Sequence, residues 1–205
     1  MRQRNRVETL AIILAAGESR RMGIPKALLA YSDSETFLEH LASVFKAAGC
    51  QALAVLGASA EEIAERHPSM EVVKNPSWQR GQYSSALVGL ARAGDRNAQR
   101  VLLHPVDMPL VRAPTVRALL SALATDSAVV PQYQGAPGHP LALTSVAARA
   151  VAQQTSAPHL EAALQSVSLR QIVVDDPGVV RNINTAEDYE RVFGTTPRRL
   201  SAPTG

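Results

Sequence analysis

Cations cluster behind a short apolar run near the start of the chain. The run Leu10–Ala16 is long enough for a buried parallel strand. The small residue Gly17 follows, and then the cations Arg21 and Lys26. Small residues let the backbone approach a ligand closely, because little side chain intervenes. Backbone N–H groups combined with guanidinium and ammonium groups favour a polyphosphate ligand.

The spacing excludes two common phosphate-binding loops. A Walker A loop has four residues between its glycines and a Lys-Ser/Thr pair directly afterwards. Here five residues separate Gly17 from Gly23, and Lys26 follows Ile24 and Pro25. The stretch does not match the Gly-x-Gly-x-x-Gly dinucleotide fingerprint either.

A carboxylate follows another apolar run in the middle of the chain. Asp107 comes shortly after the expected strand Val101–Leu103, and Pro109 stiffens the turn behind it. A carboxylate positioned by a buried strand suits Mg²⁺, which prefers oxygen ligands and keeps several waters. The alternative is an ordinary turn aspartate or a helix N-cap.

Two further segments place polar residues at the ends of expected elements. Asn75 ends a short strand, and the loop through Gly81 leads to a helix N-terminus at Ser84, next to Ser85, where anions are favoured. The alternative for this loop is an ordinary serine N-cap, with Trp78 packed in it. The tripeptide Gly138–Pro140 presents a histidine from an extended backbone, unless that histidine is incidental to a turn.

These segments, together with Asn182 and Asn184, resemble the motifs of the MobA-like nucleotidyltransferases. The opening pattern of that family is matched at Leu14, Ala15, Ala16, Gly17, Ser19, Arg21, Met22, Gly23 and Lys26. Asp107 falls on its V-D-x-P motif, Asn75–Ser85 on its N-P-x-W-x-x-G-x-x-S-S motif, and Gly138–Pro140 on a G-H-P motif. The resemblance covers Leu10 to Phe193.

The resemblance implies a role for each matched residue. Arg21, Lys26 and Asp107 are the expected catalytic residues: Arg21 would bind the β- and γ-phosphates, Lys26 the α-phosphate, and Asp107 a Mg²⁺ ion. The rest of the nucleotide site would comprise Leu14, Ala15, Ala16, Gly17, Asn75, Gly81 and Ser85. Gly138, His139 and Pro140 would face the acceptor substrate.

One departure from the family pattern concerns the metal. Asn182 and Asn184 stand where the family segment D-I-D-T-P-E-D has aspartates. An amide oxygen still binds Mg²⁺, but the site loses negative charge. Either asparagine would complete the site with Asp107, or Asp107 alone would suffice. We expect Asp188 to lie in the first turn of a helix, where its charge favours the dipole.

The implied reaction is transfer of CMP from CTP to molybdopterin with release of pyrophosphate. Ala15-Ala16-Gly17 is typical of the cytidylyl-transferring branch, whereas guanylyl-transferring members tend to carry Leu-Ala-Gly-Gly. The two asparagines do not fit the cytidylyl branch. Alternatives are a GTP-dependent enzyme, a sugar- or alcohol-phosphate nucleotidyltransferase, and a non-catalytic accessory protein that binds the molybdenum cofactor. A molybdenum hydroxylase would be the partner that receives the product.

Strand and helix patterns alternate along the chain. The expected strands are 10–16, 52–56, 72–73, 101–103, 128–133, 141–144 and 172–174. Helices are expected to begin at Thr36, at a capping box on Ser59, at Ser84 (closed by Gly94), at Pro114, Ser145, His159 and Thr185. This order predicts a three-layer α/β/α sandwich with a Rossmann-like, mostly parallel sheet, of the nucleotide-diphospho-sugar transferase type. We expect one domain, 7–193, with flexible tails at 1–6 and 194–205.

Composition narrows the function classes. The chain has 205 residues and 19% charged residues. Its net charge of +3 is small and does not favour nucleic acid or a membrane surface as the partner. A single cysteine, Cys50, excludes an internal disulfide and a thiolate zinc cluster. The basic start followed by an apolar run imitates a secretory signal, but Glu8 interrupts it. We therefore expect a cytoplasmic protein.

Overall fold

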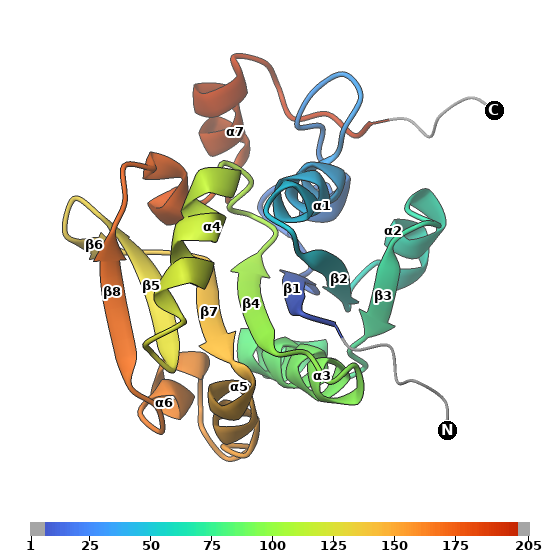
Figure 1. Cartoon of the computed structure of the whole chain (residues 1–205). Helices are drawn as coiled ribbons and strands as arrows, with labels where there is room; N and C mark the ends of the chain where they lie inside the picture. The colour runs from blue at the N-terminus through green and yellow to red at the C-terminus, as the bar shows by residue number, and fades with distance from the viewer. Residues whose placement is uncertain (1–6, 201–205) are drawn as a thin grey trace.

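A β-sheet forms the centre of the protein (Figure 1). The computed structural model describes residues 7–200. The strands run in the order β3-β2-β1-β4-β7-β5-β6, with β8 beside β5. The neighbours β3, β2, β1 and β4 are parallel, whereas β7 runs antiparallel to β4 and β5. The strand bounds are β1 Thr9–Ala15, β2 Gln51–Leu56, β3 Glu71–Lys74, β4 Arg100–Pro105, β5 Ala128–Tyr133, β6 Ala136–Pro137, β7 Leu141–Thr144 and β8 Leu169–Val173.

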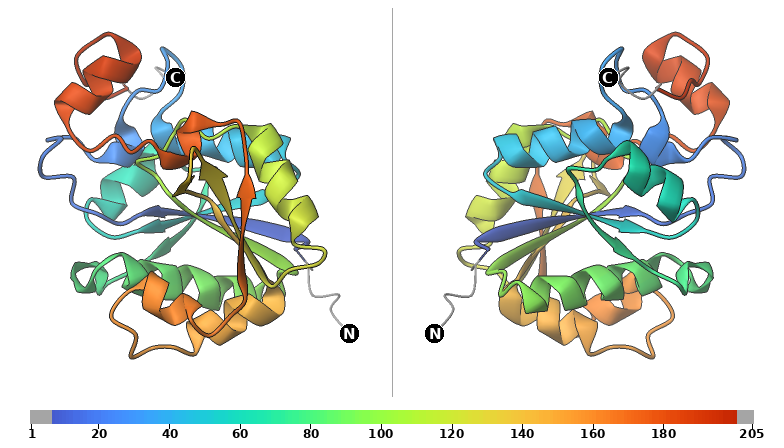
Figure 2. Two further views of the ribbon diagram at one scale, coloured as in Figure 1. Left: turned by 90° about the vertical axis from the view of Figure 1, so that its left-hand side faces the viewer. Right: turned by 90° about the vertical axis from the view of Figure 1, so that its right-hand side faces the viewer.

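Helices cover both faces of this sheet, which confirms the expected three-layer α/β/α sandwich (Figure 2). One layer contains α1 Phe37–Ala47, α2 Ala60–Arg66 and α4 Ala113–Ala122, with α7 Ala186–Phe193 at its margin. The other layer contains α3 Gln82–Asp95, α5 Ser145–Ala152 and α6 Leu160–Leu164. Every residue of β1 is buried, because the helices exclude water from both of its faces. Within residues 7–200, no helix is long and apolar enough to cross a bilayer.

Two threonines begin helices α1 and α7, as expected. Thr36 starts α1 with a capping box: its hydroxyl accepts the Glu39 N–H, and the Glu39 carboxylate accepts the Thr36 N–H. Thr185 and Asp188 form the same reciprocal pair at the start of α7. The expectation that Asp188 lies in the first turn of a helix is therefore confirmed.

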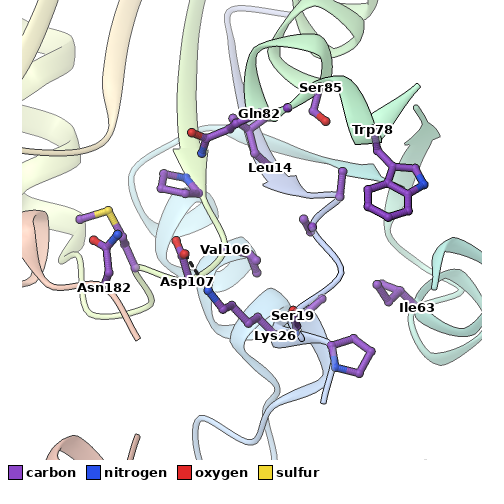
Figure 3. Close-up of a pocket in the computed structure, with 18 of the residues that line it drawn as sticks. Leu14, Ser19, Lys26, Ile63, Trp78, Gln82, Ser85, Val106, Asp107 and Asn182 are labelled. Atoms are coloured by element: carbon purple, nitrogen blue, oxygen red, sulfur yellow. Dashed lines mark hydrogen bonds and ion pairs between the residues drawn. The ribbon is translucent and has the colours of Figure 1, made fainter. Parts of the chain in front are cut away.

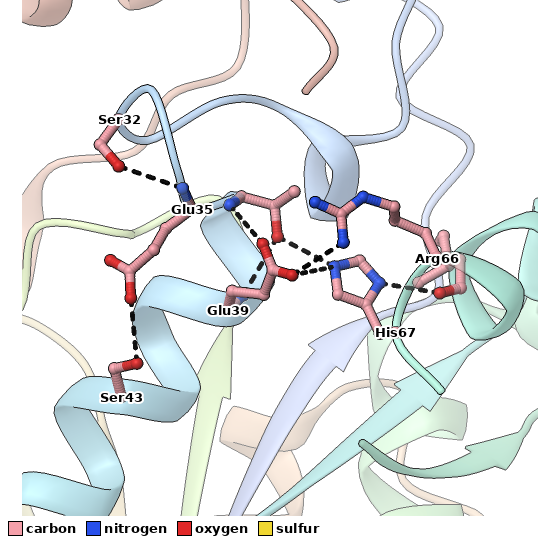
Figure 4. A network of polar contacts seen from close by, with 8 residues as sticks. Ser32, Glu35, Glu39, Ser43, Arg66 and His67 are labelled. Atoms are coloured by element: carbon pink, nitrogen blue, oxygen red, sulfur yellow. Dashed lines mark hydrogen bonds and ion pairs between the residues drawn. The ribbon is translucent and has the colours of Figure 1, made fainter. Parts of the chain in front are cut away.

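A polar network joins the start of α1 to the end of α2 (Figure 4). The buried His67 ring bonds to the Thr36 hydroxyl at 2.9 Å and to the Ile63 carbonyl at 2.8 Å. Arg66 donates to Glu39 at 2.9 Å. Because these bonds hold α2 against α1, they also fix the position of Ile63.

Several local predictions were wrong. Ser59 adopts a left-handed conformation with φ 54° and makes no capping bond, so the expected capping box is absent. Gly94 does not end α3, which continues to Asp95. A glycine near the end of a helix is tolerated, because its low helix propensity reduces the stability only modestly. After β5 the chain turns at Gln134 and Gly135, and Ala136 then pairs with Tyr133 in the short strand β6.

The segment 194–200 has an ordered path, although we expected it to be part of a flexible tail. Ala30 N–H donates to the Arg198 carbonyl at 3.0 Å, and Leu200 N–H donates to the Leu28 carbonyl at 3.3 Å. Arg199 also pairs with Glu62 on α2. Low hydrophobicity made this segment look unstructured, but its order comes from backbone pairing. The other expected tail residues, 1–6 and 201–205, lie outside the described residues.

A buried histidine supports the turn behind β4. His104 is 0% exposed, and its Nε2 donates to the Met108 carbonyl at 2.9 Å. Burial lowers its pKa to about 3, and the neighbouring His139 acts in the same direction. The ring is therefore neutral at physiological pH, which suits a structural role in this turn.

Truncation after Thr196 should lower the free energy of unfolding by about 1–3 kcal/mol, because two inter-segment backbone bonds and the Arg199 contact are lost. Urea denaturation measures this loss. Removal of 201–205 alone is the matched control. Equal stability of the two truncated chains would contradict a structural role for 197–200.

Acidification should destabilise the protein through His104. Its folded-state pKa lies below its unfolded value, so the stabilisation is complete above that unfolded value and is lost as pH falls toward about 3. Between about pH 7 and about pH 5 this group alone should remove about 2 kcal/mol from the free energy of unfolding. Urea midpoints of wild type and His104→Gln across this range measure it. An identical pH slope in both proteins would contradict the assignment.

Candidate functional site

A cavity of about 470 Å³ lies beyond the carboxyl ends of β1 and β4 (Figure 3). Ligands of open parallel sheets bind at this place. The residues from the sequence analysis that line it are Leu14, Ala15, Ala16, Gly17, Lys26, Gly81, Ser85, Asp107, His139 and Asn182. The parallel strands thus bring together segments that are far apart in the sequence.

The loop after β1 turns back on itself and delivers Lys26 to the cavity. Ser19 adopts φ 56° and Gly23 φ 73°, and the N–H groups of Met22 and Gly23 both donate to the Ser19 carbonyl. The Ser19 hydroxyl then accepts the backbone N–H of Lys26 at 3.1 Å. A left-handed conformation is cheap for Gly23, which explains a glycine at that position.

Lys26 contacts both the Asp107 loop and the segment Asn182–Asn184. Its ammonium group lies 2.9 Å from Asp107 Oδ2 and 2.6 Å from Asn184 Oδ1. Both partners of the ion pair are largely buried, with side chains 14% and 20% exposed. The Ile183 N–H donates to the Asp107 carbonyl at 2.8 Å, which holds the asparagine segment beside the aspartate. The three chain segments therefore meet at one charged centre.

The donor set around Asp107 fits a Mg²⁺ ion that is bound largely through phosphate and water. Asp107 Oδ1 is buried and has no hydrogen-bond partner among the described residues, so one carboxylate oxygen remains available. Asn182 lines the same cavity, whereas Asn184 Oδ1 already accepts a bond from Lys26. Residues 7–200 contain no group of three or more His, Cys, Asp or Glu side chains arranged for a metal. One carboxylate plus substrate phosphates is a common arrangement for Mg²⁺.

Asn75 supports the cavity from behind and does not line it. Its side chain is 2% exposed, its amide nitrogen donates to Ser84 and Ser85 at 2.9 Å each, and its oxygen accepts the Ser77 N–H. The Ser85 oxygen accepts one of these bonds at the cavity wall. Its hydroxyl proton is therefore directed elsewhere, so Ser85 is suited to donate to a ligand.

Trp78 forms the opposite wall of the cavity, near Ile63 (Figure 3). A Cβ atom on Gly57 would lie 2.6 Å from Trp78 Cβ and 2.7 Å from the Ala16 carbonyl oxygen. Gly57 therefore allows this ring to pack closely beside the first loop, which agrees with the packing interpretation of Trp78. The cavity also exposes the ring to a ligand, which the sequence analysis did not favour.

Other lining residues were not identified from sequence. They include Ser19, Ile63, Gln79, Gln82 and Met108. Ser19 stood in the first motif and could have been chosen. The other four residues stand in no recognisable sequence pattern, and only the folded structure shows that they line the cavity.

Besides Asn75 and Asn184, three expected site residues do not line the cavity, namely Arg21, Gly138 and Pro140. Arg21 is exposed on the first loop, so its expected role requires the side chain to reach an incoming ligand. Of the tripeptide, only His139 reaches the cavity wall. Gly138 is packed elsewhere, since a Cβ atom on it would lie 2.2 Å from the Val179 carbonyl oxygen. Burial lowers the pKa of His139, although the Asp107 carboxylate opposes this shift.

Known proteins resemble this chain over most of its length. A profile of the MobA-like NTP transferase domain matches residues 11–177. The probable molybdenum cofactor guanylyltransferase of Mycobacterium ulcerans is 29% identical over 194 residues, covering 91% of this chain and 94% of that protein. The molybdenum cofactor cytidylyltransferase of Escherichia coli is 23% identical over 181 residues, covering 87% and 92%.

The fold is also similar to solved structures. The crystal structure of Rv0371c from Mycobacterium tuberculosis matches with a TM-score of 0.77 and 27% identity, covering 93% of this chain and 99% of that one. The domain profile spans most of the chain and includes Lys26, Asp107 and His139. The chain therefore belongs to the MobA-like NTP transferase family and is a nucleotidyltransferase.

Proposed function

We propose that this protein transfers CMP from CTP to molybdopterin, releases pyrophosphate and requires Mg²⁺. The observation that supports it most is the contact of Lys26 with Asp107 in a cavity that also has an aromatic wall. A cation and a carboxylate at one point suit phosphoryl chemistry, because the cation attracts phosphate and the acid attracts a divalent metal. Relatives named as molybdenum cofactor nucleotidyltransferases support the choice of acceptor.

The nucleotide would lie across the cavity from the Trp78 wall to Lys26. Ser85 would donate to the base or ribose, and the N–H groups around Ala16 and Gly17 would face the phosphates. The Lys26 ammonium group would then stabilise charge on the α-phosphate. Arg21, exposed on the same loop, would bind the departing pyrophosphate.

The acceptor would approach from the side of His139 and Asn182, which line the cavity. Its phosphate oxygen must stand in line with the bond to the leaving pyrophosphate, so catalysis consists mainly of positioning and charge neutralisation. Asp107, through Oδ1, and the asparagine amide of Asn182 would hold Mg²⁺, which supplies neutralisation of the phosphate oxygens. A receiving molybdenum hydroxylase stays a prediction from the sequence.

Ala16 favours the pyrimidine nucleotide. Its carbonyl accepts the Ala58 N–H at 3.0 Å, so the first loop is tied to the segment after β2. Its side chain lines the cavity and cannot move away without breaking that bond. A methyl group at this fixed position leaves less room beside the base than a glycine would. GTP is the second candidate, because the Mycobacterium ulcerans relative is named a guanylyltransferase.

Pyrophosphate release from CTP and GTP, with and without molybdopterin and Mg²⁺, tests the proposal. We expect release from CTP that depends on both molybdopterin and the metal. Faster turnover of GTP would identify the guanylyl reaction. Turnover only with a sugar or alcohol phosphate would show that the acceptor is one of these compounds and not molybdopterin. Binding of nucleotide or pterin without turnover would indicate an accessory binding protein.

Lys26→Ala and Asp107→Asn should each lower kcat about hundredfold or more, because each removes a preorganised charge from the transfer centre. Steady-state pyrophosphate release measures this effect. Lys46→Ala is the matched control, since Lys46 is exposed on α1. Activity of the Lys26 variant near that of the control would contradict the assignment.

Ala16→Gly should increase kcat/KM for GTP relative to CTP by about tenfold, which corresponds to the removal of one methyl-sized steric contact. Competition between the two nucleotides measures the ratio. An unchanged ratio would show that selectivity is set elsewhere in the cavity.

A further inference from the structure

The short 3₁₀ helix η3, Pro177–Val180, lies directly against two loops of the site. A Cβ atom on Gly178 would lie 2.1 Å from the Leu110 carbonyl oxygen, and one on Gly138 would lie 2.2 Å from the Val179 carbonyl oxygen. The His139 N–H donates to that Val179 carbonyl at 2.8 Å. The backbone of η3 therefore contacts Leu110, which follows Asp107 in the chain, and the loop Gly138–Pro140, here called the histidine loop.

One buried carboxylate holds η3 in this place. Asp176 is 1% exposed, and its Oδ2 accepts the Arg112 N–H at 2.9 Å and the Thr115 hydroxyl at 2.6 Å. Its Oδ1 accepts the Gly178 N–H at 3.1 Å and lies 3.3 Å from Arg112 Nε. Because an ionised carboxylate is purely an acceptor, it satisfies donors from α4 and from η3 at the same time.

Only a few residues separate η3 from the segment that contacts Lys26 and Asp107, the charged pair of the site. Asn182 lines the cavity two residues after the end of η3. Ile183 N–H then bonds to the Asp107 carbonyl, and Asn184 accepts a bond from Lys26. A shift of η3 would therefore move the asparagine segment and the His139 loop relative to Asp107.

We propose that Asp176 is a positioning residue for the transfer reaction: it clamps η3 between α4 and the histidine loop and thereby sets the acceptor side of the site. This inference rests on the proposed function. The nucleotide side depends on other elements, namely β1, the Ser19 turn and the start of α3. Loss of the clamp should consequently affect the acceptor and leave nucleotide binding nearly intact.

The test uses Asp176→Asn, which places an amide NH2 group against hydrogen-bond donors in either orientation of the amide. Thr115→Val is the milder second variant, because it removes one of the four contacts and leaves the carboxylate in place. Asp175→Asn is the matched control: it is the preceding residue, exposed, and also loses one negative charge. Thermal unfolding verifies that each variant is folded.

Steady-state kinetics separate a positioning role from a merely structural one. For Asp176→Asn we expect KM for molybdopterin to rise and kcat to fall, together by about tenfold or more in kcat/KM, while the dissociation constant of CTP changes less than about twofold. Thr115→Val should show a smaller change in the same direction, and Asp175→Asn none. A parallel loss of CTP affinity, or unchanged acceptor kinetics in a destabilised protein, would overturn the proposal.

Amide hydrogen exchange tests the clamp without any substrate. The Ile183 and His139 amides should exchange at least about tenfold faster in Asp176→Asn, whereas amides of β1 should not change. If wild type shows no transfer with any acceptor, the proposed function fails, and the exchange rates still decide whether the clamp exists. Unchanged exchange at both amides would refute it.

Discussion

The arrangement of the site depends on the ion pair between Lys26 and Asp107. The two groups are 81 positions apart, and both are largely withdrawn from water. Removing a charge from water is costly, so such a pair persists only where the geometry is good and further polar contacts are present. Asn184 supplies one such contact to the ammonium group. The fold thus holds one cation and one carboxylate side by side, where they would bind a nucleotide phosphate and its metal.

The parallel half of the sheet is the reason that these residues meet. β1 and β4 are adjacent and parallel, so the loops that follow them emerge at the same edge. The Val106 N–H donates to the Leu14 carbonyl, which extends this register into the start of the Asp107 loop. The antiparallel strand β7 then returns on the far side of β4, and the histidine loop enters from there. Each loop contributes a different chemical group, and the sheet determines their order.

Much of this could be predicted from the sequence, because the decisive signals are local. The apolar run before Gly17, the threonine that caps α7 and the acid behind β4 are visible in short stretches of sequence. Other features depend on distant contacts and leave no local signal. Gly138 was expected to face the acceptor substrate. Its position also has a steric reason, because any side chain there would clash with the Val179 carbonyl. Asp176 has no motif of its own, since its partners Arg112 and Thr115 lie more than sixty positions earlier. The pairing of Arg198 with Ala30 is likewise invisible in a polar, proline-containing segment.

We propose that a nucleotide phosphate binds beside Lys26 and Asp107. A crystal structure with Mg²⁺ and a non-hydrolysable CTP analogue tests it most directly. We expect an α-phosphate oxygen within about 3 Å of Lys26 Nζ and a metal on Asp107 Oδ1. A nucleotide bound elsewhere, or one whose phosphates leave Lys26 and Asp107 paired only with each other, would contradict it.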